Sequence, residues 1–123
     1  MSRILLIEDD QPFRRALSLH LTKAGYAITE VEHGRAGLAA HQAQPFDLIV
    51  TDLIMPEMEG VETIRALRKI TPTLPIIAMS GGGRSSPEDY LSIARQFGAA
   101  AVLAKPFALK DLTDAIAGLL GAK

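Results

Sequence analysis

The chain has 123 residues, of which 48% are hydrophobic and 22% charged, and these proportions are typical of one compact globular domain. Thirteen basic and fourteen acidic residues give a formal net charge of −1, so no positive excess favours nucleic acid or an anionic membrane as a partner. The absence of cysteine excludes disulfides, thiolate metal sites and thiol catalysis. The apolar run 4–7 is too short for a secretion signal or a membrane span, which predicts a cytoplasmic location.

Short apolar runs predict the strands of a parallel sheet. Four runs have the character of strands that are covered on both faces: residues 4–7, 48–50, 76–79 and 101–104. Residues 27–31 mix apolar and polar side chains, which is typical of an edge strand.

Segments with helical spacing alternate with these runs. Their apolar positions begin at Phe13, Ala36, Val61, Leu91 and Leu109. Gly25 and Gly98 stand where glycines that end helices are expected. The alternation predicts an α/β fold, a doubly wound (βα)5 flavodoxin-like sandwich. Its five parallel strands would have the order 2-1-3-4-5, with helices on both faces of the sheet.

Reactive side chains follow the carboxyl ends of four predicted strands. Glu8 and Asp9 follow the first strand, Asp52 follows the third, Ser80 ends the fourth, and Lys105 follows the fifth. Ligands of a doubly wound sheet bind beyond the carboxyl ends of its strands, where the strand order reverses, so we expect these side chains to converge.

The residue types at this edge predict metal-assisted phosphoryl chemistry. Clustered carboxylates repel one another unless a cation lies among them, and oxygen ligands without histidine or cysteine suit Mg²⁺. A carboxylate beside such an ion can act as a nucleophile toward phosphorus. Lys105 and Ser80 could then hold the phosphoryl oxygens. Each residue alone has an ordinary explanation as a cap, a turn residue or a solvated lysine, and only their joint placement favours a site.

A more specific pattern lies in residues 4–10, in residues 47–60, in Ser80 and in Lys105-Pro106-Phe107. Together these stretches resemble the receiver domain of two-component response regulators, over essentially the whole chain. Residues 52–60, an aspartate followed by a Met-Pro-x-Met-acid-Gly turn, form a highly specific motif by themselves. The resemblance implies that residues 1–123 form a single receiver domain.

The resemblance also implies a role for each acidic residue of the pattern. Asp52 would be the phosphoacceptor, and Glu8 and Asp9 would be the acid pair of a Mg²⁺ site, with Asp9 as a direct ligand. Asp52 and the backbone carbonyl of Ile54 would complete the metal ligands. Asp10 matches no required site residue, and we expect it to cap the first helix.

Two further residues gain roles from the resemblance. Ser80 would be the hydroxyl that follows the phosphoryl group, and Lys105 would be the ion-pair partner of that group. The bond from Lys105 to Pro106 is expected to be cis.

The function implied is that of a cytoplasmic phosphoprotein in a two-component phosphorelay. A histidine kinase or a histidine phosphotransfer protein would donate the phosphoryl group to Asp52 in a Mg²⁺-dependent reaction. The resulting change in conformation would control a downstream protein partner, with no nucleic acid or membrane bound. Such a protein is a signalling protein and not an enzyme, since it catalyses only its own phosphotransfer and slow autodephosphorylation. We therefore expect a stand-alone receiver, with no DNA-binding element after residue 123.

The sequence departs from the family pattern at Val102, where an aromatic residue that changes rotamer is usual. A valine cannot swing in this way, so we expect the signal to appear instead as ordering or rearrangement of residues 81–86 and of the start of the helix at Pro87. The histidines have no metal-ligand spacing and are expected at the surface: His20, His33 and His41.

Three alternatives stay open. The chain could be the receiver fragment of a longer regulator or hybrid kinase. An aspartate-nucleophile phosphatase would need an acid two residues after Asp52, where the sequence has Ile54. A carrier of flavin mononucleotide would need neutral groups after the first strand, where Glu8, Asp9 and Asp10 would repel its phosphate.

Overall fold

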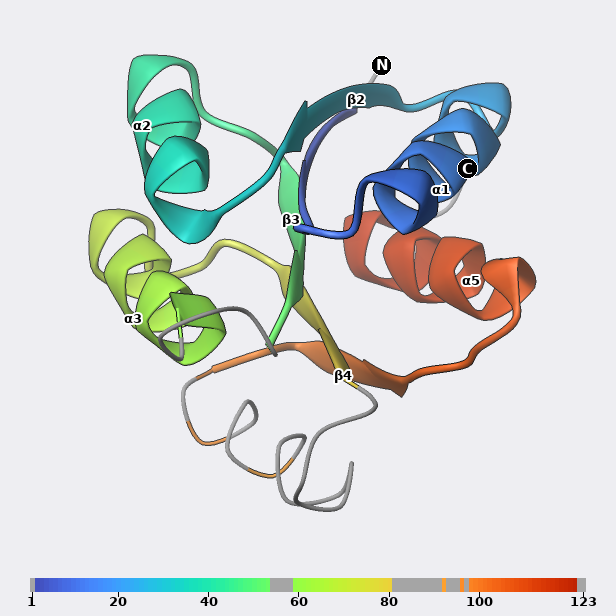
Figure 1. The fold of residues 1–123 in the computed structure, drawn as a ribbon. Coiled ribbons are helices and arrows are strands. Elements are labelled where there is room, and N and C mark those ends of the chain that lie inside the picture. Colours follow the sequence, from blue (N-terminus) through green and yellow to red (C-terminus); the bar gives the residue numbers. More distant parts are fainter. Residues whose placement is uncertain (1, 54–58, 81–91, 93–95, 97, 122–123) are drawn as a thin grey trace.

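Five parallel strands form one sheet in the order β2-β1-β3-β4-β5, which confirms the predicted topology (Figure 1). The computed structural model describes residues 2–53, 59–80, 92, 96 and 98–121. The strands are β1 (Arg3–Ile7), β2 (Ala27–Val31), β3 (Leu48–Asp52), β4 (Ile76–Ser80) and β5 (Ala101–Ala104). The helices are α1 (Gln11–Lys23), α2 (Gly34–Ala43), α3 (Glu59–Ile70) and α5 (Leu109–Leu120). The helix predicted to begin near Leu91 and the segment 81–86 lie outside the described residues.

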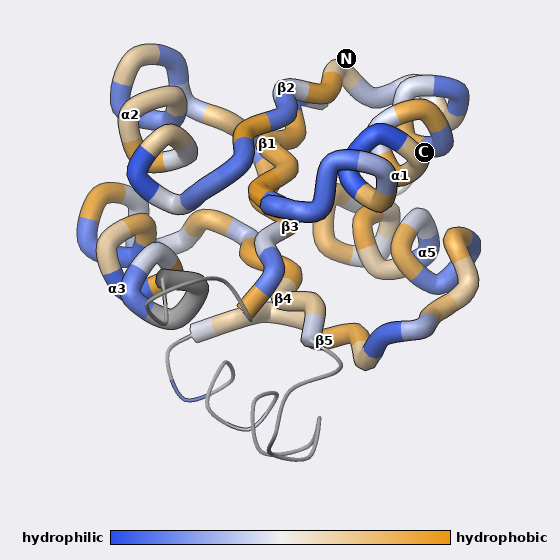
Figure 2. The backbone as a smooth tube through the Cα atoms, in the orientation of Figure 1, coloured by the Kyte–Doolittle hydropathy of each residue, from blue (hydrophilic) through white to orange (hydrophobic). Residues whose placement is uncertain are grey.

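Helices cover both faces of the sheet, with α1 and α5 on one face and α2 and α3 on the other (Figure 1). Side chains along a strand point alternately to the two faces. In β1, Ile4 and Leu6 pack with α1 and α5, whereas Leu5 and Ile7 pack on the side of α2 and α3. Figure 2 shows the hydrophobic residues concentrated in the central strands. Within the described ranges, no helix has the length and apolar character that crossing a membrane requires.

The two edge strands are less buried than the three central ones. Every residue of β2 is half-buried, which confirms the predicted edge strand. Residues 101–104 are less buried than the predicted covering of both faces implies, because Ala101 to Leu103 are half-buried and Ala104 is exposed. Ala101 and Leu103 still pack on one face of the sheet and Val102 on the other. An apolar run does not reveal how many neighbours a strand has, and β5 pairs with β4 alone.

The predicted helix ends are confirmed where the structure describes them. Asp10 caps α1, since its Oδ1 accepts a hydrogen bond of 3.2 Å from the backbone N–H of Phe13. Gly25 follows the end of α1 with a positive φ angle of 103°, which side chains with a Cβ rarely adopt. Gly98 also has a positive φ angle, of 102°, but the helix that it is predicted to end lies outside the described residues.

His41 is buried, which corrects the expectation that the histidines lie at the surface. Only 2% of the residue is exposed. Its Nδ1 accepts a hydrogen bond of 3.1 Å from the backbone N–H of Phe46, so the proton of the neutral ring lies on Nε2, which is 3.0 Å from Thr71 Oγ1. His41 therefore links α2 to the chain before β3 and to the end of α3.

This burial predicts that the contribution of His41 to stability falls in mild acid. Burial lowers the pKa of His41 below its ordinary 6.5, so from pH 6.5 downward the unfolded chain binds a proton that the folded chain excludes. The contribution of His41 to the free energy of unfolding should fall across that interval, until the pH reaches the lowered pKa of the folded state. Urea unfolding of wild type and His41→Gln between about pH 8 and pH 5 measures this effect.

The variant serves as the control for the other groups that titrate in the same interval. His41→Gln should cost about 1–3 kcal/mol at pH 8, because it disturbs two buried hydrogen bonds, and this deficit should shrink toward pH 5. A deficit that is constant with pH would contradict the prediction.

Candidate functional site

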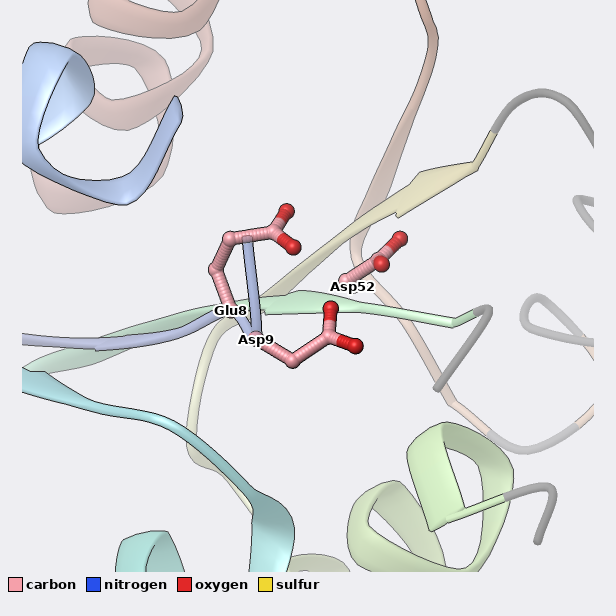
Figure 3. Close-up of side chains that lie close together, drawn as sticks. All are labelled: Glu8, Asp9 and Asp52. Carbon is pink, nitrogen blue, oxygen red and sulfur yellow. The ribbon is translucent and has the colours of Figure 1, made fainter. Parts of the chain in front are cut away.

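The register between β1 and β3 places acidic residues side by side at one edge of the sheet. Ile7 pairs with Thr51, and Glu8 and Asp52 are the next residues of the two chains. Carboxylate oxygens of Glu8, Asp9 and Asp52 lie within 4.8 Å of one another. Figure 3 shows the three side chains gathered where β1 and β3 end.

Lys105 reaches this cluster from β5, at the far side of β4. Its Nζ lies 2.9 Å from Glu8 Oε1 and 3.5 Å from Asp52 Oδ1. The alternation along each strand explains the meeting, because Glu8, Asp52 and Lys105 continue the series that faces α1 and α5. The structure thus brings together the acidic and basic residues that the sequence predicts to converge.

The electrostatics of the cluster are governed by burial. Glu8 is only 1% exposed and Asp52 only 3% exposed, whereas Asp9 is exposed. Burial raises the pKa of Glu8 to about 6, with a further rise from the nearby Asp52 charge, while Lys105 acts in the opposite direction. A single ammonium therefore does not compensate the clustered carboxylates.

This donor set fits a hard divalent cation. It consists of carboxylate oxygens from three residues, two of them buried and one open to solvent, with no histidine or cysteine among them. Such a set is preferred by Mg²⁺, which keeps several water ligands and tolerates an open side of the site. The raised pKa of Glu8 supports the fit, because a cation would relieve the repulsion that helps to raise it. Ile54, whose carbonyl is the remaining predicted ligand, lies outside the described residues.

Ser80 contributes a hydroxyl between the two strands that carry Asp52 and Lys105. It ends β4, and it is fully buried. Within the described part of the chain, Ser80 Oγ has no hydrogen-bond partner. A buried hydroxyl without a partner costs free energy, so this atom is suited to bind a group that enters the site.

The predicted cis peptide bond before Pro106 is confirmed. The peptide bond between Lys105 and Pro106 is cis. Phe107 follows, and its ring makes an edge-to-face contact with the ring of Phe13, with centroids 6.1 Å apart.

Arg14 is a site-supporting residue that the sequence interpretation missed. It is 7% exposed, and its Nη1 donates a hydrogen bond of 2.9 Å to the backbone carbonyl of Glu8. Its Nε lies 3.1 Å from Glu30 Oε1, which compensates the buried charge. Arg14 thereby ties α1 to the end of β1 and to β2. One signal was available, because Arg14 lies three residues before Leu17 and thus on the apolar face of the predicted helix.

Comparison with known proteins identifies the family. Residues 4–117 match the family model described as "Response regulator receiver domain". The chain belongs to the response regulator receiver family. Receivers of this family are signalling proteins of two-component systems, which exchange signals with histidine kinases and downstream effectors.

Two relatives differ in how much of their length the receiver chain spans. The response regulator receiver protein CpdR of Brucella abortus is 40% identical over 120 residues, which are 98% of each chain. The transcriptional regulatory protein QseB of Haemophilus influenzae is 33% identical over 118 residues, which are 96% of this receiver but only 52% of QseB. Because QseB is described as a transcriptional regulatory protein, the expected absence of a nucleic-acid partner stays a prediction.

Solved structures agree with the fold. The chemotaxis protein CheY4 of Vibrio cholerae has a TM-score of 0.86 at 31% identity, covering 98% of the receiver and 99% of CheY4. The response regulator TrrA of Thermotoga maritima, solved in complex with Mg²⁺ and beryllofluoride, has a TM-score of 0.85 at 28% identity. That match covers 98% of the receiver and 100% of TrrA.

The burial of the Glu8 carboxylate beside Asp52 predicts that Glu8→Gln stabilises the metal-free receiver. Because burial and Asp52 raise the pKa of Glu8 from 4.5 to about 6, its ionised form opposes folding at neutral pH. Replacing it by a neutral amide should raise the free energy of unfolding by on the order of 1 kcal/mol in EDTA. Urea unfolding measures this change.

The same variant should gain less stability than wild type when Mg²⁺ is added, since one negative group near the ion is lost. Glu32→Gln is the matched control, because the Glu32 side chain is 71% exposed and lies 3.9 Å from Arg14. The control should change stability by less than about 0.5 kcal/mol in either condition. A destabilised Glu8→Gln receiver in EDTA would show that the ion pair with Lys105 outweighs the effects of burial and of Asp52.

Proposed function

We propose that this receiver accepts a phosphoryl group on Asp52 and that Mg²⁺ bound by Glu8, Asp9 and Asp52 supports the reaction. The observation that carries the proposal is the cluster itself. Carboxylates from β1 and β3 lie within 4.8 Å of one another, with the Lys105 ammonium 3.5 Å from Asp52. A bound Mg²⁺ would supply positive charge that offsets the carboxylates and the incoming phosphoryl oxygens.

The transfer follows from the chemistry of a carboxylate nucleophile. An oxygen of Asp52 attacks the phosphorus of a phosphohistidine, so that a new P–O bond forms as the P–N bond breaks. The imidazole nitrogen leaves with the bonding electron pair and takes a proton from solvent. Asp52 is nearly buried, and this burial limits its hydration and its freedom to move.

Lys105 and Ser80 would detect the product of this transfer. Lys105 already lies between Glu8 and Asp52, so added negative charge on Asp52 draws the ammonium toward it. The buried Ser80 hydroxyl can donate a hydrogen bond to a phosphoryl oxygen. Phosphorylation shifts the population of conformers only by the difference in these interactions between the two states.

The proposed setting is a cytoplasmic phosphorelay in which residues 1–123 act as one receiver domain. A histidine kinase or a histidine phosphotransfer protein supplies the phosphoryl group, and the phosphorylated form controls a protein partner. The match to CpdR over 98% of both chains supports the assignment of these residues to one receiver domain.

The first prediction from this proposal concerns the phosphoacceptor. Incubation with acetyl phosphate and Mg²⁺ should add the mass of one phosphoryl group to the wild-type protein, and EDTA should prevent the gain. Asp52→Asn should abolish the gain because an amide is not a comparable nucleophile. Glu8→Gln combined with Asp9→Asn should slow it by weakening Mg²⁺ binding. Intact-mass spectrometry over time provides the measurement.

Asp47→Asn is the matched control, because Asp47 precedes β3 at its opposite end and accepts a 2.7 Å hydrogen bond from the Arg3 backbone. That variant should be labelled at the wild-type rate. Labelling of Asp52→Asn as fast as wild type would mean that the nucleophile is another residue.

The second prediction separates the chemistry from its detection. Lys105→Ala should still be phosphorylated, since the carboxylates and Mg²⁺ suffice for transfer, but its conformation should respond less. Amide NMR spectra with and without Mg²⁺ and beryllofluoride measure the response. Lys110→Ala is the control, because the Lys110 side chain is 82% exposed on α5. Chemical shift changes in Lys105→Ala as large as in wild type would contradict the proposed role.

A further inference from the structure

The Lys105 ammonium lies against an aromatic ring as well as against the carboxylates. Its Nζ is 4.5 Å from the centroid of the Phe13 ring in α1. An ammonium at this distance is attracted by the negative face of the ring. Phe13 is half-buried, so part of the water that would weaken this attraction is excluded.

The Phe13 ring is part of a continuous set of contacts that begins and ends at Lys105. Lys105 Nζ binds Glu8 Oε1, and Glu8 Oε2 accepts a 3.1 Å hydrogen bond from the backbone N–H of Asp10. Asp10 Oδ1 in turn accepts from the backbone N–H of Phe13, whose ring meets Lys105 again. The helix cap of α1 therefore fixes both the Glu8 carboxylate and the ring that hold the ammonium.

A second contact holds the ring in place. Phe107, two residues after Lys105, packs edge-to-face on Phe13 with an angle of 73° between the ring planes. This arrangement is a favourable one for two aromatic rings. The end of β5 is thus attached to the start of α1 at two points, one through the ammonium and one through the phenyl ring.

These contacts favour the position of Lys105 near Glu8. The ammonium is 2.9 Å from Glu8 but 3.5 Å from Asp52, and the contact with Phe13 is made in this arrangement. When negative charge is added to Asp52, the ammonium must give up part of its contact with Glu8 to approach the new group. Any free energy gained from the ring in the resting position opposes that movement.

We propose that Phe13 is a positioning residue. Its ring stabilises the Lys105 ammonium in the position beside Glu8 and so limits the response to phosphorylation. The inference rests on the proposed function, because it assumes that Lys105 moves toward a phosphoryl group on Asp52. Phe13, at the start of α1, would thereby influence the equilibrium between the resting and phosphorylated conformers.

The test compares the affinity for beryllofluoride, in saturating Mg²⁺, of wild type, Phe13→Leu and Phe13→Tyr. Leucine lacks the ring, so the ammonium should move away from Glu8 with a smaller loss of free energy. Phe13→Leu should therefore bind beryllofluoride about two- to fivefold more tightly. Tyrosine keeps the aromatic face and should bind with nearly the wild-type affinity. Urea unfolding of each variant confirms that it is folded under the conditions of the titration.

The same substitution in a Lys105→Met protein distinguishes the contact between the ring and the ammonium from a general effect of packing. In that background Phe13→Leu should leave the affinity unchanged, because the ammonium that the ring holds is absent. An equal change in both backgrounds would overturn the inference, as would unchanged or weaker binding by Phe13→Leu alone. Wild-type protein that binds no beryllofluoride would instead overturn the proposed function, and the inference with it.

A proton NMR measurement tests the contact between Phe13 and Lys105 in the free protein. The ring current of Phe13 should shift the ε-methylene protons of Lys105 upfield in wild type and in Phe13→Tyr but not in Phe13→Leu. Beryllofluoride and Mg²⁺ should reduce this shift as the ammonium leaves the ring. An upfield shift that is absent from the free wild-type protein, or that persists in full with beryllofluoride, would overturn the inference.

Discussion

The gathering of the Glu8, Asp9 and Asp52 carboxylates at a largely buried edge of the sheet is the constraint on which the rest of this receiver depends. The parallel register of β1 and β3 forces the first and last of these residues to the same level, and burial deprives them of water. Lys105 offsets part of the charge, at 2.9 Å from Glu8 and 3.5 Å from Asp52. Burial, with a further effect of the Asp52 charge, raises the pKa of Glu8 despite the ion pair with Lys105, and the site therefore favours added positive charge.

The surrounding structure holds the carboxylates in place. Arg14 donates to the Glu8 carbonyl from α1, and Asp10 caps the same helix while its backbone N–H binds the Glu8 carboxylate. Fully buried leucine and isoleucine side chains on both faces of β1 fix the strand that carries Glu8, and each contributes roughly 1.5–3 kcal/mol by burial. The hydrophobic core thus offsets the electrostatic cost of the site.

Much of the site was predictable because strand ends in a parallel sheet share one edge. The sequence predicted the strand order, the cap at Asp10, the cis bond before Pro106 and the convergence of the acidic residues with Lys105. It did not predict the supporting residues. Arg14 and Phe13 act through contacts with residues that are distant along the chain or in another element, and no spacing in the sequence specifies such partners.

By itself the sequence determined the alternation of strands and helices, because apolar periodicity and helix caps are local properties of the chain. Only the tertiary structure decided how exposed each element is. The apolar residues 101–104 form an edge strand with partial exposure, and His41 of α2 lies buried against the end of α3. Burial depends on what packs against a residue, so the local sequence predicts neither the partial exposure of residues 101–104 nor the burial of His41. The same reason explains why the contact between the Lys105 ammonium and the Phe13 ring was not predicted, because it joins the segment after β5 to the start of α1.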